Sequence, residues 1–386
     1  MNNWKKYKLS EVCQKITDGS HFSPKEDLTG SFLIASVKDM NDFGFTRSSC
    51  KKISENDYEN LIKNDCVPNK NDILFSKDGT IGLIYFVKEK MDIALLSSIA
   101  IVRPNPELIN PKFLFFFIKN PITQNYIKNF LKSGSALPRV VLKDLSTLPI
   151  TFPTKQEQTR IANFLSQLDD RIELNRQINN NLEELADTYF KRLFFVNKIN
   201  SGGLGELITE KTESVKNENL EQVQILSAVK TGDLINSEEY FTKQVFSQNI
   251  SKYKKVTLWD FAYNPARINI GSIGMLNRDI LGGVSPVYTV FRAKKGYEHF
   301  MNLLIKQNFT KKQIENLCFG GVRQVLRFSD LASIQIPIPT ETEIKEFNTF
   351  YLPLLAKIES NKKQNETLAN YRDSILPKLM SGEIEI

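Results

Sequence analysis

Two stretches of this chain, almost half its length apart, repeat the same pattern of residues. "GSALPRVVLKDLSTLPITFPT" begins at Gly134, and "GGVRQVLRFSDLASIQIPIPT" begins at Gly320. An aspartate-leucine pair follows at the same distance in both, at Asp144 and at Asp330. An internal duplication constrains the fold more than any single motif does, because both copies must adopt related structures.

The duplication extends upstream. "ILFSKDGTIGLIYF" from Ile73 corresponds to "FAYNPARINIGSIGML" from Phe261, and "IASVK" from Ile34 corresponds to "LSAVK" from Leu226. The spacing drifts slightly along the chain, which indicates small insertions in loops between retained elements. The 386 residues are therefore predicted to form two tandem units of about 190 residues each.

The pattern of apolar residues changes along each unit. Short apolar runs such as "FLIASV", "DILFS", "IYFV" and "SSIAIVRP" predict strands, because Gly, Asn, Asp and Pro interrupt them. Apolar residues then recur at three- and four-residue steps, which is typical of a helix. We predict a mixed α+β fold with two α/β domains, residues 1–153 and 197–339, each followed by a long helix, residues 154–196 and 340–386.

The two predicted helices share a regular apolar seam. It runs through Ile161, Leu165, Leu168, Ile172, Asn175, Asn179, Leu182, Ala186, Tyr189 and Leu193, and again through Phe347, Tyr351, Leu354, Ile358, Asn361, Asn365, Leu368, Arg372, Ile375 and Leu379. The alternating steps are the a/d spacing of a coiled coil. A run of about 40 residues measures ~60 Å, longer than an ordinary amphipathic helix on a globular core. We expect the two helices to pair antiparallel.

Two asparagines interrupt each seam. Antiparallel pairing places Asn175 opposite Asn365 and Asn179 opposite Asn361. A buried asparagine weakens a coiled coil, but it penalises slipped registers in which it would face leucine. We expect these four residues to fix the register of the helix pair.

Composition narrows the class of protein. The net charge of +7 favours an anionic partner, although such an excess is often only a solvated surface. The N-terminal "MNNWKKYKLSEV" lacks the apolar segment of a signal peptide, and the run Phe113 to Ile118 is too short to span a bilayer. Four cysteines without C-x-x-C spacing indicate neither a zinc site nor a disulfide framework. We expect a cytoplasmic protein with free thiols, no metal and no cofactor.

Several motifs occur in an order that resembles a known family. They are "ITDGSHFSPK" from Ile16, "DGTIG" and "NIGSIG" at corresponding places, "GGVRQVLRFSDL", and the helix entries "ITFPTKQEQTRIANFL" and "IPIPTETEI". Together they resemble the specificity subunit of type I restriction-modification systems over the whole chain. The resemblance implies two target recognition domains that read a bipartite, asymmetric double-stranded DNA target. It also implies a non-catalytic chain that directs two methyltransferase subunits and the restriction (translocase) subunits to that target.

One departure distinguishes the two domains. The first contains the D-G-x-H loop around His21, and the second has no counterpart of it. We therefore expect the two domains to read different sequences.

Candidate DNA contacts are polar and basic residues in the glycine-rich loops between strands. In the first domain they are Ser20, His21, Ser23, Lys25, Ser76, Lys77, Thr80, Arg139 and Lys143; in the second they are Asn264, Arg267, Asn269, Ser272, Arg323, Gln324 and Arg327. Such side chains bind phosphates or pair with base edges, Arg with guanine and Asn or Gln with adenine.

Two other functions remain open from the residues alone. One is a scaffold that joins two protein partners without binding DNA. The other is an enzyme of unrecognised chemistry, although "YNPA" from Tyr263 lacks the second proline and the aromatic residue of an adenine methyltransferase loop. The chain has no G-x-x-x-x-G-K-[ST] motif either. We expect His21 to be a polar loop residue rather than a catalytic base.

Overall fold

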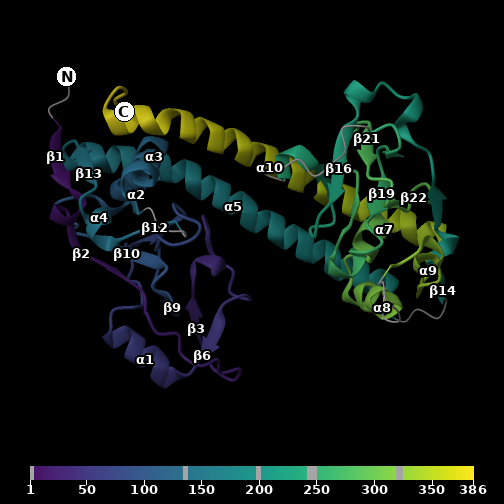
Figure 1. Ribbon diagram of the computed structural model, residues 1–386, viewed down its shortest axis with the longest axis horizontal. Coiled ribbons are helices and arrows are strands. Elements are labelled where there is room, and N and C mark those ends of the chain that lie inside the picture. The colour runs from purple at the N-terminus through teal and green to yellow at the C-terminus, as the bar shows by residue number, and fades with distance from the viewer. Residues whose placement is uncertain (1–3, 134–137, 197–200, 241–249, 319–324) are drawn as a thin grey trace. The chain divides into compact units, whose positions relative to one another are not determined.

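A computed structural model describes residues 4–133, 138–196, 201–240, 250–318 and 325–386 (Figure 1). Its internal contacts divide the chain into two units. One contains Met1–Ile178 together with Ser360–Ile386, and the other contains Asn179–Glu359. Each of the two long helices therefore contributes one half to each unit.

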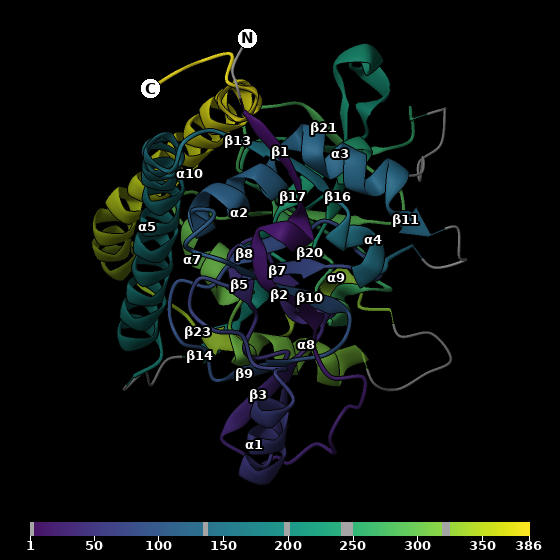
Figure 2. The ribbon, with the colours of Figure 1, turned by 90° about the vertical axis from the view of Figure 1, so that its left-hand side faces the viewer.

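A four-stranded antiparallel sheet forms the centre of the first unit (Figure 2). Its strands, in spatial order, are β2 (Cys13–Asp18), β10 (Ile99–Pro104), β7 (Ile73–Ser76) and β8 (Ile84–Phe86). A second sheet consists of β6 (Lys51–Ile53), β3 (Phe32–Ala35) and β9 (Ile93–Leu95), in which β3 and β9 run parallel. The remaining elements are β1 (Lys5–Lys8), β4 (Met40–Asn41), β5 (Gly44–Phe45), β11 (Lys132–Ser133), β12 (Arg139–Val140), β13 (Pro149–Phe152), α1 (Glu55–Lys63), α2 (Pro111–Lys119), α3 (Pro121–Phe130) and α4 (Leu142–Ser146).

The second unit repeats the strand order of the central sheet and the parallel pair of the second sheet. Its central sheet has the order β15 (Ile208–Lys211), β22 (Thr289–Ala293), β19 (Asp260–Tyr263) and β20 (Ile273–Met275). Its second sheet has the order β17 (Leu234–Asn236), β16 (Gln224–Ala228), β21 (Gly282–Val284) and β18 (Lys254–Val256), and β16 runs parallel to β21. The remaining elements are β14 (Ser201–Gly203), β23 (Gln335–Pro337), the short 3₁₀ helix η6 (Ile268–Ile270), α6 (Ser237–Tyr240), α7 (Glu298–Leu304), α8 (Asn308–Cys318) and α9 (Phe328–Ala332).

The helical stretch after β10 is divided into α2 and α3 by its sequence. Asn110 and Asn120 each precede a proline, and each caps a helix with its side-chain carbonyl oxygen. Proline is favourable at the first helical position because its missing N–H would have no partner there. The buried residues Phe113–Ile118 of α2 join the core formed with the long helices.

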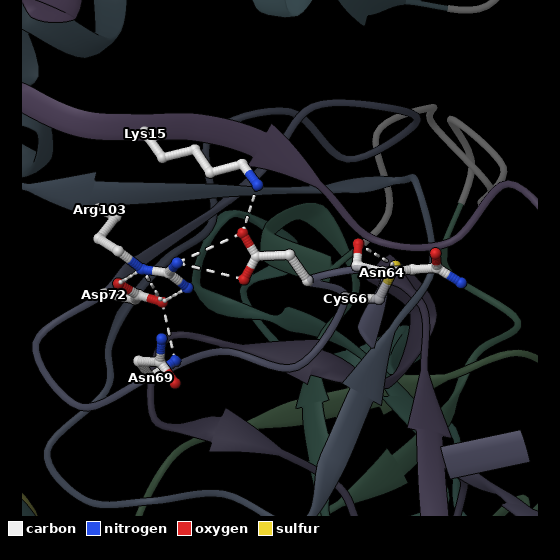
Figure 3. Close-up of polar contacts among 7 residues, drawn as sticks. Lys15, Asn64, Cys66, Asn69, Asp72 and Arg103 are labelled. Atoms are coloured by element: carbon white, nitrogen blue, oxygen red, sulfur yellow. Dashed lines mark hydrogen bonds and ion pairs between the residues drawn. The ribbon is translucent and has the colours of Figure 1, made fainter. Parts of the chain in front are cut away.

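A buried aspartate is paired with an arginine of the neighbouring strand at the same place in both central sheets. In the first unit Arg103 donates to Asp72 (Nη2–Oδ2 2.9 Å) and to Asp65 (Nη1–Oδ1 3.1 Å), which also accepts from Lys15 (Figure 3). In the second unit Arg292 donates to buried Asp260 (Nε–Oδ1 2.7 Å). A buried carboxylate needs such a partner, so the pairs fix the same end of each sheet.

The two long helices are α5 (Lys155–Phe194) and α10 (Glu341–Ser381), and they begin alike. Thr154 and Glu157 form a capping box before α5, because the N–H of Thr154 donates to Glu157 and the N–H of Glu157 donates to the Thr154 hydroxyl. Thr340 and Glu343 repeat this arrangement before α10. Pro353 lies inside α10, which continues through it.

The contacts within each unit show that α5 and α10 are antiparallel, as predicted. In the first unit, Ile161 and Leu165 share one core with Leu376 and Leu379. Asn175 lies further along, where its Nδ2 donates to Asn365 (2.9 Å) and to Gln364 (2.7 Å). In the second unit, a core of aromatic side chains joins Phe190, Phe194 and Phe347, and Asn179 donates to the carbonyl of Ile358 (3.3 Å). None of the described helices is long and apolar enough to cross a bilayer.

Candidate nucleic-acid interface

Several loops lie together at one end of the central sheet in the first unit. β2 ends at Asp18 and β7 ends at Ser76 at this end of the sheet, and β12 lies beside them. The N–H of Val140 donates to the carbonyl of Lys77 (2.8 Å), and that of Gly79 donates to the carbonyl of Pro138 (3.2 Å). The sequence-predicted residues His21, Lys77 and Arg139 therefore meet at a single corner, although they are far apart in the chain.

A cluster of charged side chains fills this corner. Lys77 is only 1% exposed, and its Nζ lies 3.2 Å from Asp18 Oδ2 and 3.4 Å from Asp78 Oδ2. His21 Nε2 lies 3.4 Å from the other oxygen of Asp18, and Arg139 Nε lies 3.2 Å from Asp78 Oδ1. A buried lysine thus holds two carboxylates, and each carboxylate contacts one surface side chain.

The surface members of the cluster are the ones available to a ligand. The side chain of His21 is 71% exposed and that of Arg139 is 46% exposed. Arg139 can therefore present its guanidinium to a phosphate or a guanine while Asp78 restricts its orientation.

Two predicted contacts in the first unit are internal instead. The side chain of Lys77 is almost completely buried, as described above. Ser76 is fully buried, and its hydroxyl donates to the carbonyl of Thr80 (2.6 Å) and accepts from the N–H of Leu83 (2.8 Å). Both residues shape the turn that follows β7, because a buried polar group must find its partners inside the protein. Neither residue could be recognised as internal from its sequence context, since burial depends on how β12 covers the turn.

The other predicted residues of the first unit lie at or near the surface. Ser20 closes a turn by accepting from the N–H of Phe22 (3.1 Å), and Ser23 accepts from Lys51 (3.4 Å). Lys25 and Thr80 are exposed in their loops, and Lys143 is exposed on α4.

The equivalent corner of the second unit consists of the turn between β19 and β20, residues 264–272. The N–H of Leu326 donates to the carbonyl of Pro265 (3.1 Å), so the segment before α9 covers this turn as β12 covers its counterpart. Arg267 is exposed at the centre of the turn, and Asn264 accepts from the N–H of Ala266 (3.1 Å).

The remaining predicted residues of this corner occupy different environments. Ser272 is half-buried and donates to the carbonyl of Ala228 (3.5 Å), and Asn269 is half-buried in η6. Arg327 is exposed, and its N–H donates to Asp330 (3.1 Å). Arg323 and Gln324 lie outside the described residues.

Sheet register allows the two corners to be compared position by position. Asp72 and Asp260 each face an arginine on the neighbouring strand, so Lys77 and Asp78 correspond to Pro265 and Ala266. The repeat in the sequence likewise aligns Arg139 with Val325. The positions that carry the ionic cluster in the first unit therefore have uncharged side chains on equivalent backbone in the second unit. Counting the repeat spacing through Asp72 and Asp260 could have revealed this difference from the sequence.

The described residues include no group of three or more His, Cys, Asp or Glu placed to hold a metal ion. All four cysteines are free thiols. Burial raises the pKa of Cys13 to about 12 and that of Cys50 to about 11, so neither thiol ionises near neutral pH.

Comparisons with known proteins agree with this architecture. Residues 1–184 match a family described as "Type I restriction modification DNA specificity domain". The specificity subunit of the type I restriction enzyme HindI from Haemophilus influenzae is 24% identical over 473 aligned residues, which cover 100% of both chains. That of MjaIX from Methanocaldococcus jannaschii is 25% identical and covers 71% of this chain and 69% of the relative.

A solved structure shares the fold. The type I restriction-modification S subunit from M. genitalium superimposes with a TM-score of 0.59 and 18% identity over 98% of this chain and 97% of that one. The likeness shows that the duplicated sheets and the antiparallel long helices form a fold that this chain shares with that subunit. The match over residues 1–184 and the similarity to whole specificity subunits relate this chain to the specificity subunits of type I restriction-modification systems, the non-catalytic subunits that recognise DNA sequence.

Proposed function

We propose that this chain reads a bipartite, asymmetric double-stranded DNA target, one half with the corner of each unit. The supporting observation is that the two sheets share strand order and cover their turns alike, but carry different side chains at matching corners. Two domains that recognise different base sequences can share a backbone, but they need different side chains at the corner that contacts DNA. The proposed readers are residues 1–153 and 197–339, and the long helices, residues 154–196 and 340–386, connect them.

In this proposal Arg139 with His21 contacts one half-site, and Arg267 with Arg327 contacts the other. Further contacts come from Ser20, Ser23, Lys25, Thr80 and Lys143 in the first unit and from Asn264, Asn269 and Ser272 in the second. Phosphate contacts give affinity for any sequence, and contacts to base edges give preference. Arg323 and Gln324 remain candidates on sequence grounds.

The chain supplies recognition rather than chemistry in this proposal. It directs methyltransferase subunits, one copy for each half of the duplicated chain, and restriction subunits to the target. The purified chain with S-adenosylmethionine and DNA should transfer no methyl group until the methyltransferase is added. Methyl transfer by the pure chain alone would overturn this proposal.

Selection of bound sequences by the chain assembled with its methyltransferase tests the two readers. Arg139→Ala should relax preference in one half-site and Arg327→Ala in the other, at a cost of about 1–3 kcal/mol for a base contact. Arg47→Ala is the matched control, because this exposed arginine forms an ion pair with Asp92 (Nη1–Oδ1 2.9 Å), away from the corner. Altered preference in both half-sites from one variant would contradict independent readers.

A further inference from the structure

A hollow of about 370 Å³ lies in the second unit beside the turn of residues 264–272. Its apolar wall consists of the buried side chains of Ile268, Ile273, Ile305 and Ile314. Ile270 also lines the hollow and is 55% exposed, so its apolar side chain remains open to solvent at this point. A volume of this size falls within the range of about 300–1,000 Å³ that is usual for small-ligand sites.

The charged groups of the hollow are mostly basic. Lys230, Lys306 and Lys311 line it, and Glu315 is the one acidic side chain among its lining residues. None of these lysines forms an ion pair with a carboxylate in the described part of the chain, unlike Lys211 and Lys255 of the same unit. The hollow therefore carries a local excess of positive charge beside an apolar wall.

Two glycines set the position of two of these lysines. Gly232 has φ +87°, and a Cβ there would lie 2.5 Å from Cε of Lys306. Gly271 has φ +91°, and a Cβ there would lie 3.5 Å from Cα of Lys230. Left-handed backbone favours glycine at both positions, and at Gly232 the absence of a side chain also leaves room for the stem of Lys306. The lysines are thus held against the backbone of the hollow.

We propose that this hollow binds one nucleoside monophosphate unit, with the base against the isoleucines and the phosphate against the lysines. Apolar side chains accept the faces of a nucleobase, and ammonium groups form charge-assisted hydrogen bonds with phosphate. The inference rests on the proposed function, because Asn269 and Gly271 belong both to the hollow and to the turn assigned to DNA. The nucleotide is accordingly one swung out of the bound duplex, and free nucleotide is the other source of the same chemistry.

The first test measures free ligands on the chain assembled with its methyltransferase. Calorimetric titration with dAMP and dTMP should show saturable binding, at least about tenfold tighter than thymidine or inorganic phosphate, because each of these supplies only half of the contacts. Lys311→Glu should weaken nucleotide binding about tenfold or more. Lys312→Glu is the matched control, because this residue is exposed on the same helix and does not line the hollow. Equal losses in the two variants would overturn the proposal, as would the absence of saturable binding.

The second test distinguishes a nucleotide swung out of the bound duplex from a free nucleotide. Duplexes with 2-aminopurine at single positions of the half-site read by the second unit should gain fluorescence on binding, because the base leaves the stack. Ile270→Glu should abolish this gain at one position. Nucleotide binding without any fluorescence gain would assign free nucleotide as the source.

Gel-shift measurements on the same complexes separate the two proposals. Retained DNA binding without nucleotide binding would refute the site and leave the proposed function intact. Nucleotide binding without DNA binding would refute the function and leave the site intact.

Discussion

The two units join their sheets to the long helices with different chemistry. In the first unit Asp169 of α5 is held by Lys119 of α2 (Nζ–Oδ2 2.9 Å) and by Arg372 of α10 (Nη1–Oδ1 2.5 Å). At the positions that the repeat makes equivalent to Asp169 and Arg372, the second unit has Leu355 and Ala186. Ala186 belongs to the apolar core of the second unit, and Leu355 packs against that core.

Aromatic packing replaces the ion pairs in the second unit. Phe347 is fully buried, with ring centroids 5.8 Å from Phe190, 5.5 Å from Phe194 and 5.1 Å from Tyr351. The comparison teaches that one backbone accepts either a charged or an apolar junction, provided that both partners change together. Changing one partner alone should therefore be costly, and changing both should be tolerated.

The largest expected effect comes from the aromatic junction. Phe347→Ala should lower the free energy of unfolding of the second unit by about 3–5 kcal/mol, because a cavity replaces a buried ring. Hydrogen exchange resolved by peptide should show faster exchange in the second unit than in the first. The matched change in the first unit, Ile161→Ala, removes a smaller side chain and should affect that unit instead. Similar exchange in both units for either variant would show that the junctions are not separate.

Breaking the ionic junction should cost somewhat less. Arg372→Ala leaves Asp169 with Lys119 alone, and the loss of one charged hydrogen bond costs about 1.5–3 kcal/mol. The double variant Asp169→Leu with Arg372→Ala copies the pair found in the second unit. It should recover most of the lost stability, as measured by denaturant unfolding. A double variant as unstable as the single one would contradict the interchangeability of the two junctions.

Mild acid, between pH 7.5 and 5, should weaken the second junction. His299 is buried between Trp259 and Tyr351, and burial lowers its pKa below the usual 6.5. The unfolded chain therefore binds a proton at higher pH than the folded one does. Stability is full above about pH 6.5 and falls towards the folded pKa, by at most about 1.4 kcal/mol per pH unit.

Unfolding of the second unit between pH 7.5 and 5 should show this slope. The variant His299→Phe should remove it. The charge of Glu298, the preceding residue on α7, raises the pKa of His299 and opposes the effect of burial, so Glu298→Gln should increase the loss of stability. A slope that persists in His299→Phe would assign it to another group.

The smallest expected effect on stability concerns the asparagine layer of the first unit. Replacing Asn175 and Asn365 together with leucine exchanges a hydrogen-bonded polar pair for an apolar one, which should stabilise by less than about 2 kcal/mol. In the double variant the two helices should instead pair in more than one register. Spin labels on unnatural residues at the exposed positions 174 and 371 should give one distance in the native chain and several in the double variant. A single unchanged distance would show that other residues fix the register.

Sequence periodicity was sufficient to predict the duplication and the two antiparallel helices, because both depend on spacing alone. It did not predict that Lys77 and Ser76 are internal, since their burial is produced by β12, which is distant in the chain. The ionic junction was missed for a related reason. Arg372 occupies a seam position that would normally be apolar, and only the approach of Asp169 and Lys119 from two other helices explains it.

The division of the chain has a consequence for its synthesis. The second unit is one continuous segment, Asn179–Glu359, and all of its contacts are present once that segment has left the ribosome. The first unit is translated earlier, but it includes Ser360–Ile386. Its helix α5 must wait, with Ile161 and Leu165 uncovered, until Leu376 and Leu379 arrive. The half that is made first is therefore completed last, and a nascent chain halted near residue 359 should display a folded second half and a first half that still needs protection from aggregation.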